Sequence, residues 1–392
     1  MTRPRTIAVL PALSPGALLP GLFGPPLAFP FCDPRTHYFY LGRGAVVRAV
    51  ERLGLAGREL LVPAYHHGVE VEALVAAGAR PRFYNVTRDF QADLASLAAE
   101  VTPDTRGLYV IHFAGFPQPM PELVAFARAH ALKVIEDCAL ALYSSDGPRP
   151  LGSRGDAAIF CLYKTLPVPH GGALWMPAPA VPFTLTSAGS LTTAHQLLAS
   201  LLVQLERRTG TIGRLARQAV RLGARLARAV GSLPADARPV GGRAFSPGQE
   251  RLAMSPVSLR IARRIDPRTV VETRRRNYYA LMSRLREVSP PMVHELPAGV
   301  SPLFYPLWVD DKPALQAALS AEGIESIDFW REGSPLVPAG RFPEVDALRA
   351  HVLELPIHQD VDLEDVERIA RVVRRVLTPG ASEARRGGRA AR

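Results

Sequence analysis

Short apolar runs alternate with helix-like stretches through the first half of this chain, and this alternation limits the fold more than any other feature. Residues 59–62 are typical of a strand, and residues 69–77 are typical of a helix. The order repeats with the run LYVIHF, a helix expected over 121–131 and a strand expected over 132–135. Strands that alternate with helices at this spacing predict βαβ units, which form a mostly parallel sheet with helices on both faces.

Two polar residues stand at the ends of apolar runs. Asp137 ends the run that begins at Leu132, and Lys164 ends a run that leads into a Gly-Gly turn. Because ligands of open parallel sheets sit beyond the carboxyl ends of the strands, both residues are candidates for one site. The chain holds 47 basic residues, yet Lys133 and Lys312 are the only other lysines. Arginine cannot replace lysine in amine chemistry, because a guanidinium stays protonated and forms no Schiff base.

The turn Gly42–Ala45, which reads GRGA, precedes a predicted amphipathic helix. The free N–H groups and the positive dipole end at such a helix start bind phosphate, although an ordinary turn explains the same residues. Three histidines, His66, His67 and His112, follow predicted strands. Taken singly, each of them is expected to have a structural role.

Pyridoxal phosphate is a cofactor that needs an acid, a lysine, a phosphate cradle and a planar platform together. Its aldehyde requires a lysine amine, and its ring nitrogen requires a buried carboxylate that keeps it protonated. Its phosphate requires donors at a helix start. Lys164, Asp137, Gly44 and His67 can supply these four features, so the residues themselves predict a pyridoxal phosphate site.

Several ordered motifs resemble the DegT/DnrJ/StrS sugar aminotransferases, a group within fold type I of the pyridoxal phosphate enzymes. The segment LVPAYHHGVEVEALVAAGARPRFYNV is similar to the family's Pro-Ala-Tyr strand end, and HFAGFP is similar to its His-x-x-Gly-x-Pro turn. The segment GDAAIFCLYKTLPVPHGGALWM resembles the part that carries the family's lysine. The resemblance runs from about Tyr38 to Leu377, with a poorly matching insert over 178–243.

The resemblance implies a role for individual residues. Lys164 falls on the lysine that forms the Schiff base and shuttles a proton, and Asp137 falls on the acid that keeps the pyridine nitrogen protonated. His67 falls on the position that stacks on the ring. Gly44 and Ala45 fall on a Gly-Thr pair that binds the phosphate. A lysine, where a dehydrating subgroup has histidine, favours amino transfer.

The chain departs from the family pattern at several site positions. Ala45 lacks the phosphate-binding hydroxyl, and the neighbouring Arg43 supplies a charge that compensates for it. Cys161 stands where the family often has a phosphate-binding serine, and a thiol is a poorer donor. Leu140 replaces a Gln or His that contacts the cofactor, and an asparagine that reaches across the dimer is missing around 251–255.

The sequence predicts an α/β fold of the fold type I transferases, with a mostly parallel sheet flanked by helices and a smaller C-terminal α+β domain. An irregular arm is expected over 1–34 and the large domain over 35–245. The small domain is expected over 246–378, and a disordered basic tail over 379–392.

The insert and the tail hold many of the arginines that give the chain a formal net charge of +11. In the predicted helix 191–230 the apolar residues and the arginines occupy different faces. Such a helix packs on the large domain or a dimer partner, lies on an anionic membrane surface, meets an acidic partner, or contacts a substrate diphosphate. Nucleic-acid binding is not expected. The apolar set is Ile212, Leu215, Ala219, Leu222, Leu226 and Val230, and the basic set is Arg214, Arg217, Arg221, Arg225 and Arg228.

An aminotransferase is the activity that these observations predict. An amino donor, glutamate by resemblance, converts the cofactor to its pyridoxamine form, which then aminates a keto group of a nucleotide-linked sugar or of a cyclitol. The resemblance implies a homodimer whose active site lies at the subunit interface. The alternative is a catalytically altered or non-catalytic descendant that acts through its arginine-rich helix on a membrane surface or an acidic partner.

The location of the protein follows from weaker signals. Prolines at positions 11, 15 and 20 interrupt the N-terminal apolar residues, and no apolar run is long enough to span a membrane, so we expect a cytoplasmic protein. The cysteines, Cys32, Cys138 and Cys161, show neither disulfide nor metal-ligand spacing, and they are expected to be buried free thiols without a metal.

Overall fold

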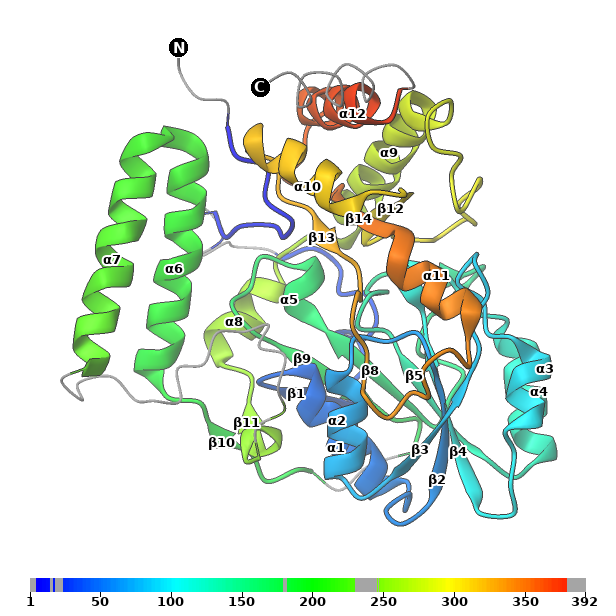
Figure 1. Cartoon of the computed structure of the whole chain (residues 1–392). Helices are drawn as coiled ribbons and strands as arrows, with labels where there is room; N and C mark the ends of the chain where they lie inside the picture. The colour runs from blue at the N-terminus through cyan, green and yellow to red at the C-terminus, as the bar shows by residue number, and fades with distance from the viewer. Residues whose placement is uncertain are drawn as a thin grey trace.

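The computed structural model describes residues 5–14, 17, 24–178, 182–229, 245 and 247–378. Figure 1 shows a large α/β part, a smaller part formed by the C-terminal third of the chain, and two long antiparallel helices beside them. The expected disordered tail and Val230 lie outside the described residues.

In the described ranges, nine strands form one sheet in the order β10-β11-β1-β9-β8-β5-β4-β2-β3. The five strands from β8 to β3 pair in parallel, while β9, β1 and β11 add antiparallel pairs at the other side. The predicted mostly parallel sheet is therefore confirmed. Its strands are β1 (Thr36–Phe39), β2 (Glu59–Pro63), β3 (Arg80–Tyr84), β4 (Thr105–Ile111), β5 (Lys133–Asp137), β8 (Ala157–Cys161), β9 (Gly172–Trp175), β10 (Thr186–Ser187) and β11 (Leu252–Ala253).

The helices of the large part form where the apolar spacing predicts them, because each buries one apolar stripe. In the first helix, Val46, Val47 and Val50 are buried. Local capping also acts, since Asp93 accepts hydrogen bonds from the first backbone N–H groups of α3. The helices are α1 (Gly42–Arg52), α2 (Val69–Ala76), α3 (Leu94–Ala99), η2 (Phe113–Gly115), α4 (Met120–Ala129), α5 (Leu162–Thr165), η3 (Gln249–Arg251) and α8 (Pro256–Ala262), and a short hairpin pairs β6 (Ser145–Asp146) with β7 (Arg149–Pro150).

The smaller part is an antiparallel sheet of order β12-β14-β13 covered by helices, which confirms the predicted α+β composition. One apolar cluster contains residues of both sheets, for example Val62 of β2 and Leu353 of β14, so the two parts share a core. The boundary expected at residue 246 stays a prediction, and β11 and α8, which follow it, pack with the large sheet. The elements are α9 (Pro267–Leu285), β12 (Phe304–Trp308), α10 (Lys312–Ala321), β13 (Ile327–Asp328), α11 (Pro343–His351), β14 (Val352–Pro356) and α12 (Leu363–Leu377).

The insert forms two helices where the sequence predicted one. Helix α6 (Ser190–Thr209) ends at Gly210, whose φ of 59° turns the chain back, and α7 (Thr211–Ala229) returns along it. In Figure 1 the pair stands beside the body, with α6 between α7 and the rest of the molecule. No helix within the described ranges has the length and apolar character that crossing a membrane requires.

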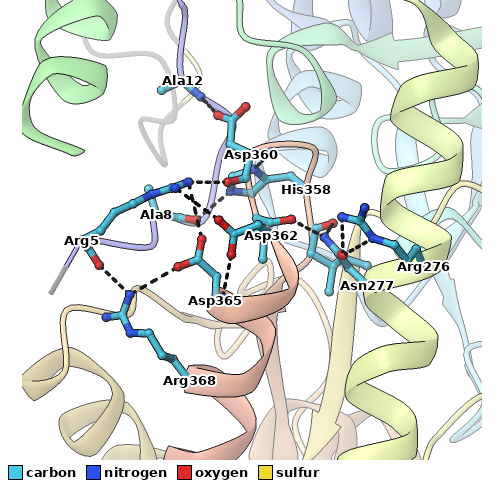
Figure 2. Close-up of polar contacts among 12 residues, drawn as sticks. Arg5, Ala8, Ala12, Arg276, Asn277, His358, Asp360, Asp362, Asp365 and Arg368 are labelled. Carbon is cyan, nitrogen blue, oxygen red and sulfur yellow. Dashed lines mark hydrogen bonds and ion pairs between the residues drawn. The ribbon is translucent and has the colours of Figure 1, made fainter. Parts of the chain in front are cut away.

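The N-terminal arm is tied to the small domain by a network of polar contacts (Figure 2). Arg5 pairs with Asp362 and Asp365, the carbonyl of Ala8 lies 2.8 Å from His358 Nε2, and the N–H of Ala12 donates to Asp360 Oδ2 at 2.8 Å. The next residue, Leu13, is fully buried among large-domain residues. The arm therefore runs from the small domain to the large one.

Candidate active site

A cavity of about 460 Å³ lies where the carboxyl ends of parallel strands meet the small sheet. Ile111, Asp137 and Cys161, which end β4, β5 and β8, all line it. Leu10 of the N-terminal arm and the segment 327–335 of the small domain line it from the other sides. The predicted edge of the sheet is thus the edge that holds the cavity.

Asp137 is held by two hydrogen bonds at the floor of this cavity. Tyr109 Oη donates to Asp137 Oδ2 at 2.6 Å, and the N–H of Ala139 donates to Oδ1 at 2.8 Å. Burial raises the pKa of Asp137, the nearby Glu70 raises it further, and the two hydrogen bonds oppose the rise. A carboxyl group in this state is fixed in orientation, and a cation placed beside it would favour its charged form.

Lys164 reaches the same cavity from α5, a single turn of helix that follows β8. Its side chain is half-buried, and the structure gives its amine no hydrogen bond within the described residues. The charge of this amine lowers the pKa of three nearby carboxyl groups, those of Asp137, Glu70 and Glu354. The lysine is therefore available to a ligand in the cavity.

The first turn of α1 divides into two halves. Gly42 and Arg43 are partly exposed and line the cavity. Gly44 and Ala45, in contrast, are buried and do not line it, since Gly44 packs against Glu250 and Phe39. The helix start is therefore close to the cavity, but Gly42 and Arg43 are the residues that face it.

His67 and its neighbours follow β2. His67 is half-buried and lines the cavity, and its backbone N–H donates to Glu70 Oε1 at 2.8 Å. His66 is fully buried and stacks on Phe83, and burial lowers its pKa to about 3, so it stays neutral. Of these two histidines, only His67 is placed to contact a ligand.

The third histidine, His112, follows β4 and contacts the buried Glu136 instead of lining the cavity. Its Nε2 lies 3.1 Å from Glu136 Oε2, and both side chains are buried. Burial would raise the pKa of Glu136, but the hydrogen bonds from His112 and from two backbone N–H groups lower it. Glu136 also accepts N–H bonds from Gly152, Arg154 and Gly155, and so fixes the loop between β5 and β8.

Two departures from the family pattern lie at the cavity wall. Cys161 and Leu140 are buried and line the cavity. Burial raises the pKa of the Cys161 thiol, so this residue stays uncharged and is a weak donor. The exposed Cys32 corrects the expectation that all three cysteines are buried, while Cys138 and Cys161 agree with it.

Glu354 is a cavity residue that sequence reasoning missed. It lies in the middle of β14, is 7% exposed, lines the cavity, and accepts no hydrogen bond from the described residues. Burial raises its pKa to about 8, while Lys164 and Arg274 oppose this rise. The signal was present in the sequence, since an acid inside the apolar run VLELPI is unusual for a buried strand.

Two arginines of the small part, one buried and one half-buried, also missed, connect it to the strand ends. Arg274 of α9 is 1% exposed and donates to the carbonyl of Thr165 at 3.3 Å, next to Lys164. Arg349 of α11 donates to the carbonyls of Ala64 and His66 at 2.8 and 3.2 Å. Both residues therefore position segments that line the cavity.

The mostly parallel sheet and the small antiparallel sheet, with Lys164 and Asp137 at the cavity between them, form the α/β architecture of the fold type I pyridoxal phosphate enzymes. The sequence profile of the DegT/DnrJ/EryC1/StrS aminotransferase family matches residues 42–185. This match covers the part of the chain that holds Asp137 and Lys164, and the members of the family depend on pyridoxal phosphate.

Similar proteins agree with this assignment. Over 352 residues the chain is 26% identical to the UDP-N-acetyl-3-dehydro-alpha-D-glucosamine 3-aminotransferase of Acidithiobacillus ferrooxidans. This alignment covers 86% of this chain and 82% of that protein. Over 137 residues it is 32% identical to the L-glutamine:scyllo-inosose aminotransferase of Streptomyces griseus, covering 34% and 32% of the two chains.

Among solved structures, AtS13 from Actinomadura melliaura superposes with a TM-score of 0.65. The superposition covers 94% of this chain and 98% of that one, at 21% sequence identity. At this identity the likeness concerns the fold, and it confirms the α/β architecture with its C-terminal domain.

Proposed function

We propose that this chain is a pyridoxal phosphate-dependent aminotransferase that transfers an amino group to the keto carbon of a sugar or cyclitol. The observation that carries the proposal is the shared cavity, which is lined both by Lys164 and by Asp137, whose two carboxyl oxygens are already held in place. Such a fixed acid opposite an available lysine is what the cofactor's ring nitrogen and aldehyde require.

The residues present fit the cofactor. Asp137 would face the ring nitrogen, and the positive charge there would offset the burial that raises the pKa of this carboxyl. His67 is the proposed ring platform, and Gly42 and Arg43 are the residues of the helix start that would meet the phosphate. Gly44 and Ala45 would act through the backbone of that turn, because their positions are buried. Cys161 would contribute at most a weak hydrogen bond.

When bound, pyridoxal phosphate supplies an aldehyde that condenses with amines and a ring that accepts the electron pair left when a neighbouring carbon loses its proton. Lys164 would hold the cofactor through its amine and would also carry a proton between carbon atoms of the substrate and the cofactor. Asp137 would keep the ring nitrogen protonated throughout. Apolar residues such as Leu140 and Ile159 would exclude water from this proton transfer.

The acceptor is proposed from the named relatives. The enzyme of Acidithiobacillus ferrooxidans is named for a nucleotide-linked keto sugar, and that of Streptomyces griseus for scyllo-inosose, a cyclitol ketone. A polyhydroxylated ketone, nucleotide-linked or a cyclitol, is therefore the proposed acceptor, with glutamate as the proposed donor. A homodimer with the cavity at the subunit interface is part of the same proposal.

The test uses the purified protein with added pyridoxal phosphate. We expect a visible absorption band that borohydride abolishes, with the reduced cofactor attached to Lys164 in a peptide mass map. Lys164→Ala should lack both the band and the attachment, whereas Lys133→Ala, which changes an exposed lysine, should keep them. Absence of the band in the wild-type protein would contradict the enzyme proposal. A band that does not change when glutamate is added would favour the non-catalytic alternative.

A further inference from the structure

We propose that the outer face of α7 docks on the surface of an anionic lipid bilayer. The proposal concerns a surface away from the cavity and does not depend on the proposed reaction. It rests on three observations: an exposed aliphatic stripe, a separate face that packs on α6, and a charge that only an acidic surface complements.

The stripe consists of large aliphatic side chains at helical spacing. Ile212, Leu215, Leu222 and Leu226 of α7 are between 58% and 71% exposed, and they form what we call the outer stripe. The sequence allowed this helix to pack by its apolar residues on the large domain, and the structure shows that it does not. Exposed aliphatic residues gathered in one stripe mark an interaction surface more often than scattered single ones do.

A different face of α7 packs on α6, so the outer stripe is not needed to hold the hairpin together. Gly213 is buried, and a Cβ atom added there would overlap the backbone of Glu206. Arg217 pairs with Glu206 at 2.8 Å, and the N–H of Gly213 donates to Thr209 Oγ1 at 3.0 Å. Gly213 and this ion pair thus lie on the side of α7 that contacts α6, and the residues of the outer stripe stay exposed.

The charge of the segment selects the partner. Residues 207–235 include seven arginines and no acidic residue. Along the sequence of α7, Arg214, Arg221, Arg225 and Arg228 succeed one another at intervals of seven, four and three residues, which is helical spacing, and Arg225 is exposed. A basic amphipathic helix with an aliphatic face binds at the boundary between anionic headgroups and acyl chains. Lipid phosphates then complement the arginines, while the stripe enters the apolar layer.

A second copy of the chain fits this face less well. In a two-fold contact the same patch meets itself, so an interface of α7 on α7 would bring arginines against arginines without an acidic residue to pair with them. The position of α7 also favours a flat partner, because Figure 1 places it as the outermost element of the hairpin. The helix would lie in the plane of the surface, in agreement with the lack of a membrane-spanning helix in the described ranges.

The experiment is co-sedimentation of the whole protein with vesicles of phosphatidylcholine alone or with roughly one-third phosphatidylglycerol. We expect binding to the anionic vesicles only. The triple variant Leu215→Ser, Leu222→Ser, Leu226→Ser should lose at least about tenfold in affinity, because burial of each leucine stem contributes. The triple variant Arg221→Gln, Arg225→Gln, Arg228→Gln should lose a similar factor, and added salt should weaken wild-type binding.

The matched control is Leu94→Ser with Leu363→Ser, which changes exposed leucines elsewhere and should leave binding unchanged. Circular dichroism shows whether each variant is folded. Failure of the wild type to bind anionic vesicles overturns the proposal, as does binding that survives loss of the three leucines. If those leucines instead control a dimer-to-monomer transition in light scattering without vesicle binding, the face is a contact between copies.

Discussion

At the scale of single residues, burial decides the chemistry of the cavity more than residue type does. Asp137 and Glu354 are both buried acids at the cavity, but only Asp137 has hydrogen-bond donors within the described residues. Asp137 is thereby fixed in one orientation. Glu354 has the charges of Lys164 and Arg274 nearby instead, and its pKa stays raised.

The first prediction follows from Glu354. Its pKa rises from 4.5 to about 8 on folding, so the folded state binds the proton more tightly than the unfolded state. The wild type should lose stability as pH increases through this window, and Glu354→Gln should not. Urea titrations at several pH values give the free energy of unfolding of wild type and variant. The difference between the two should change by a few kcal/mol across this window, because a pKa shift of this size corresponds to a free-energy change of that order.

Glu354→Asp provides the control, since it keeps a carboxyl group at the site and should retain the pH dependence of the wild type. Parallel stability curves for wild type and Glu354→Gln across the window would contradict the prediction.

At the scale of elements, the α6–α7 pair shows how one glycine can determine packing. Both Gly213 and Gly223 lie within α7, and a sequence pattern does not distinguish them. In the structure a Cβ at Gly213 would overlap α6, whereas a Cβ at Gly223 would meet nothing within 4 Å.

We therefore expect Gly213→Ala to separate α7 from α6 and Gly223→Ala to leave the pair intact. Gly223→Ala should stabilise the helix by roughly 0.5–1 kcal/mol, because alanine loses less backbone entropy than glycine. Hydrogen exchange of residues 211–229 measures both effects: faster exchange in Gly213→Ala and equal or slower exchange in Gly223→Ala. Equal exchange in the two variants would contradict the packing described here.

At the scale of the whole molecule, the N-terminal arm and the arginines Arg274 and Arg349 hold the small part against the large sheet. The arm contacts the small part through Ile7, which bridges to Ile324 just before β13, and it reaches α6, where the N–H of Leu13 donates to Ser200 Oγ at 3.2 Å. Leu10, between these anchors, lines the cavity. The arm thus belongs to the wall of the candidate site.

We expect Asp360→Ala to loosen this arm, because its carboxylate accepts the N–H of Ala12 (Figure 2). The loss of one such hydrogen bond should lower the free energy of unfolding by about 1 kcal/mol. Limited proteolysis should cut residues 5–14 faster than in the wild type. Asp310→Ala, which removes a carboxylate that is 94% exposed, should leave the cleavage rate unchanged, and faster cutting there would point to a general effect.

The sequence by itself determined the elements and the chemistry at the strand ends. Apolar periodicity predicts the βαβ order because each strand and helix buries one face, and Asp137 and Lys164 stand out because a charged residue ends an apolar run. The same pattern could not show which turn residues face the cavity: of the predicted phosphate-binding residues Arg43, Gly44 and Ala45, only Arg43 lines it, next to Gly42.

Tertiary structure decided what depends on elements far apart in the chain. Glu354 reaches Lys164 only because the small sheet packs over the large one, and Leu10 reaches the cavity only because the arm crosses between them. Likewise, the outer stripe of α7 is exposed because α6 covers another face. Local spacing predicts that a helix is amphipathic, but the neighbour that covers each face is set by packing between distant segments.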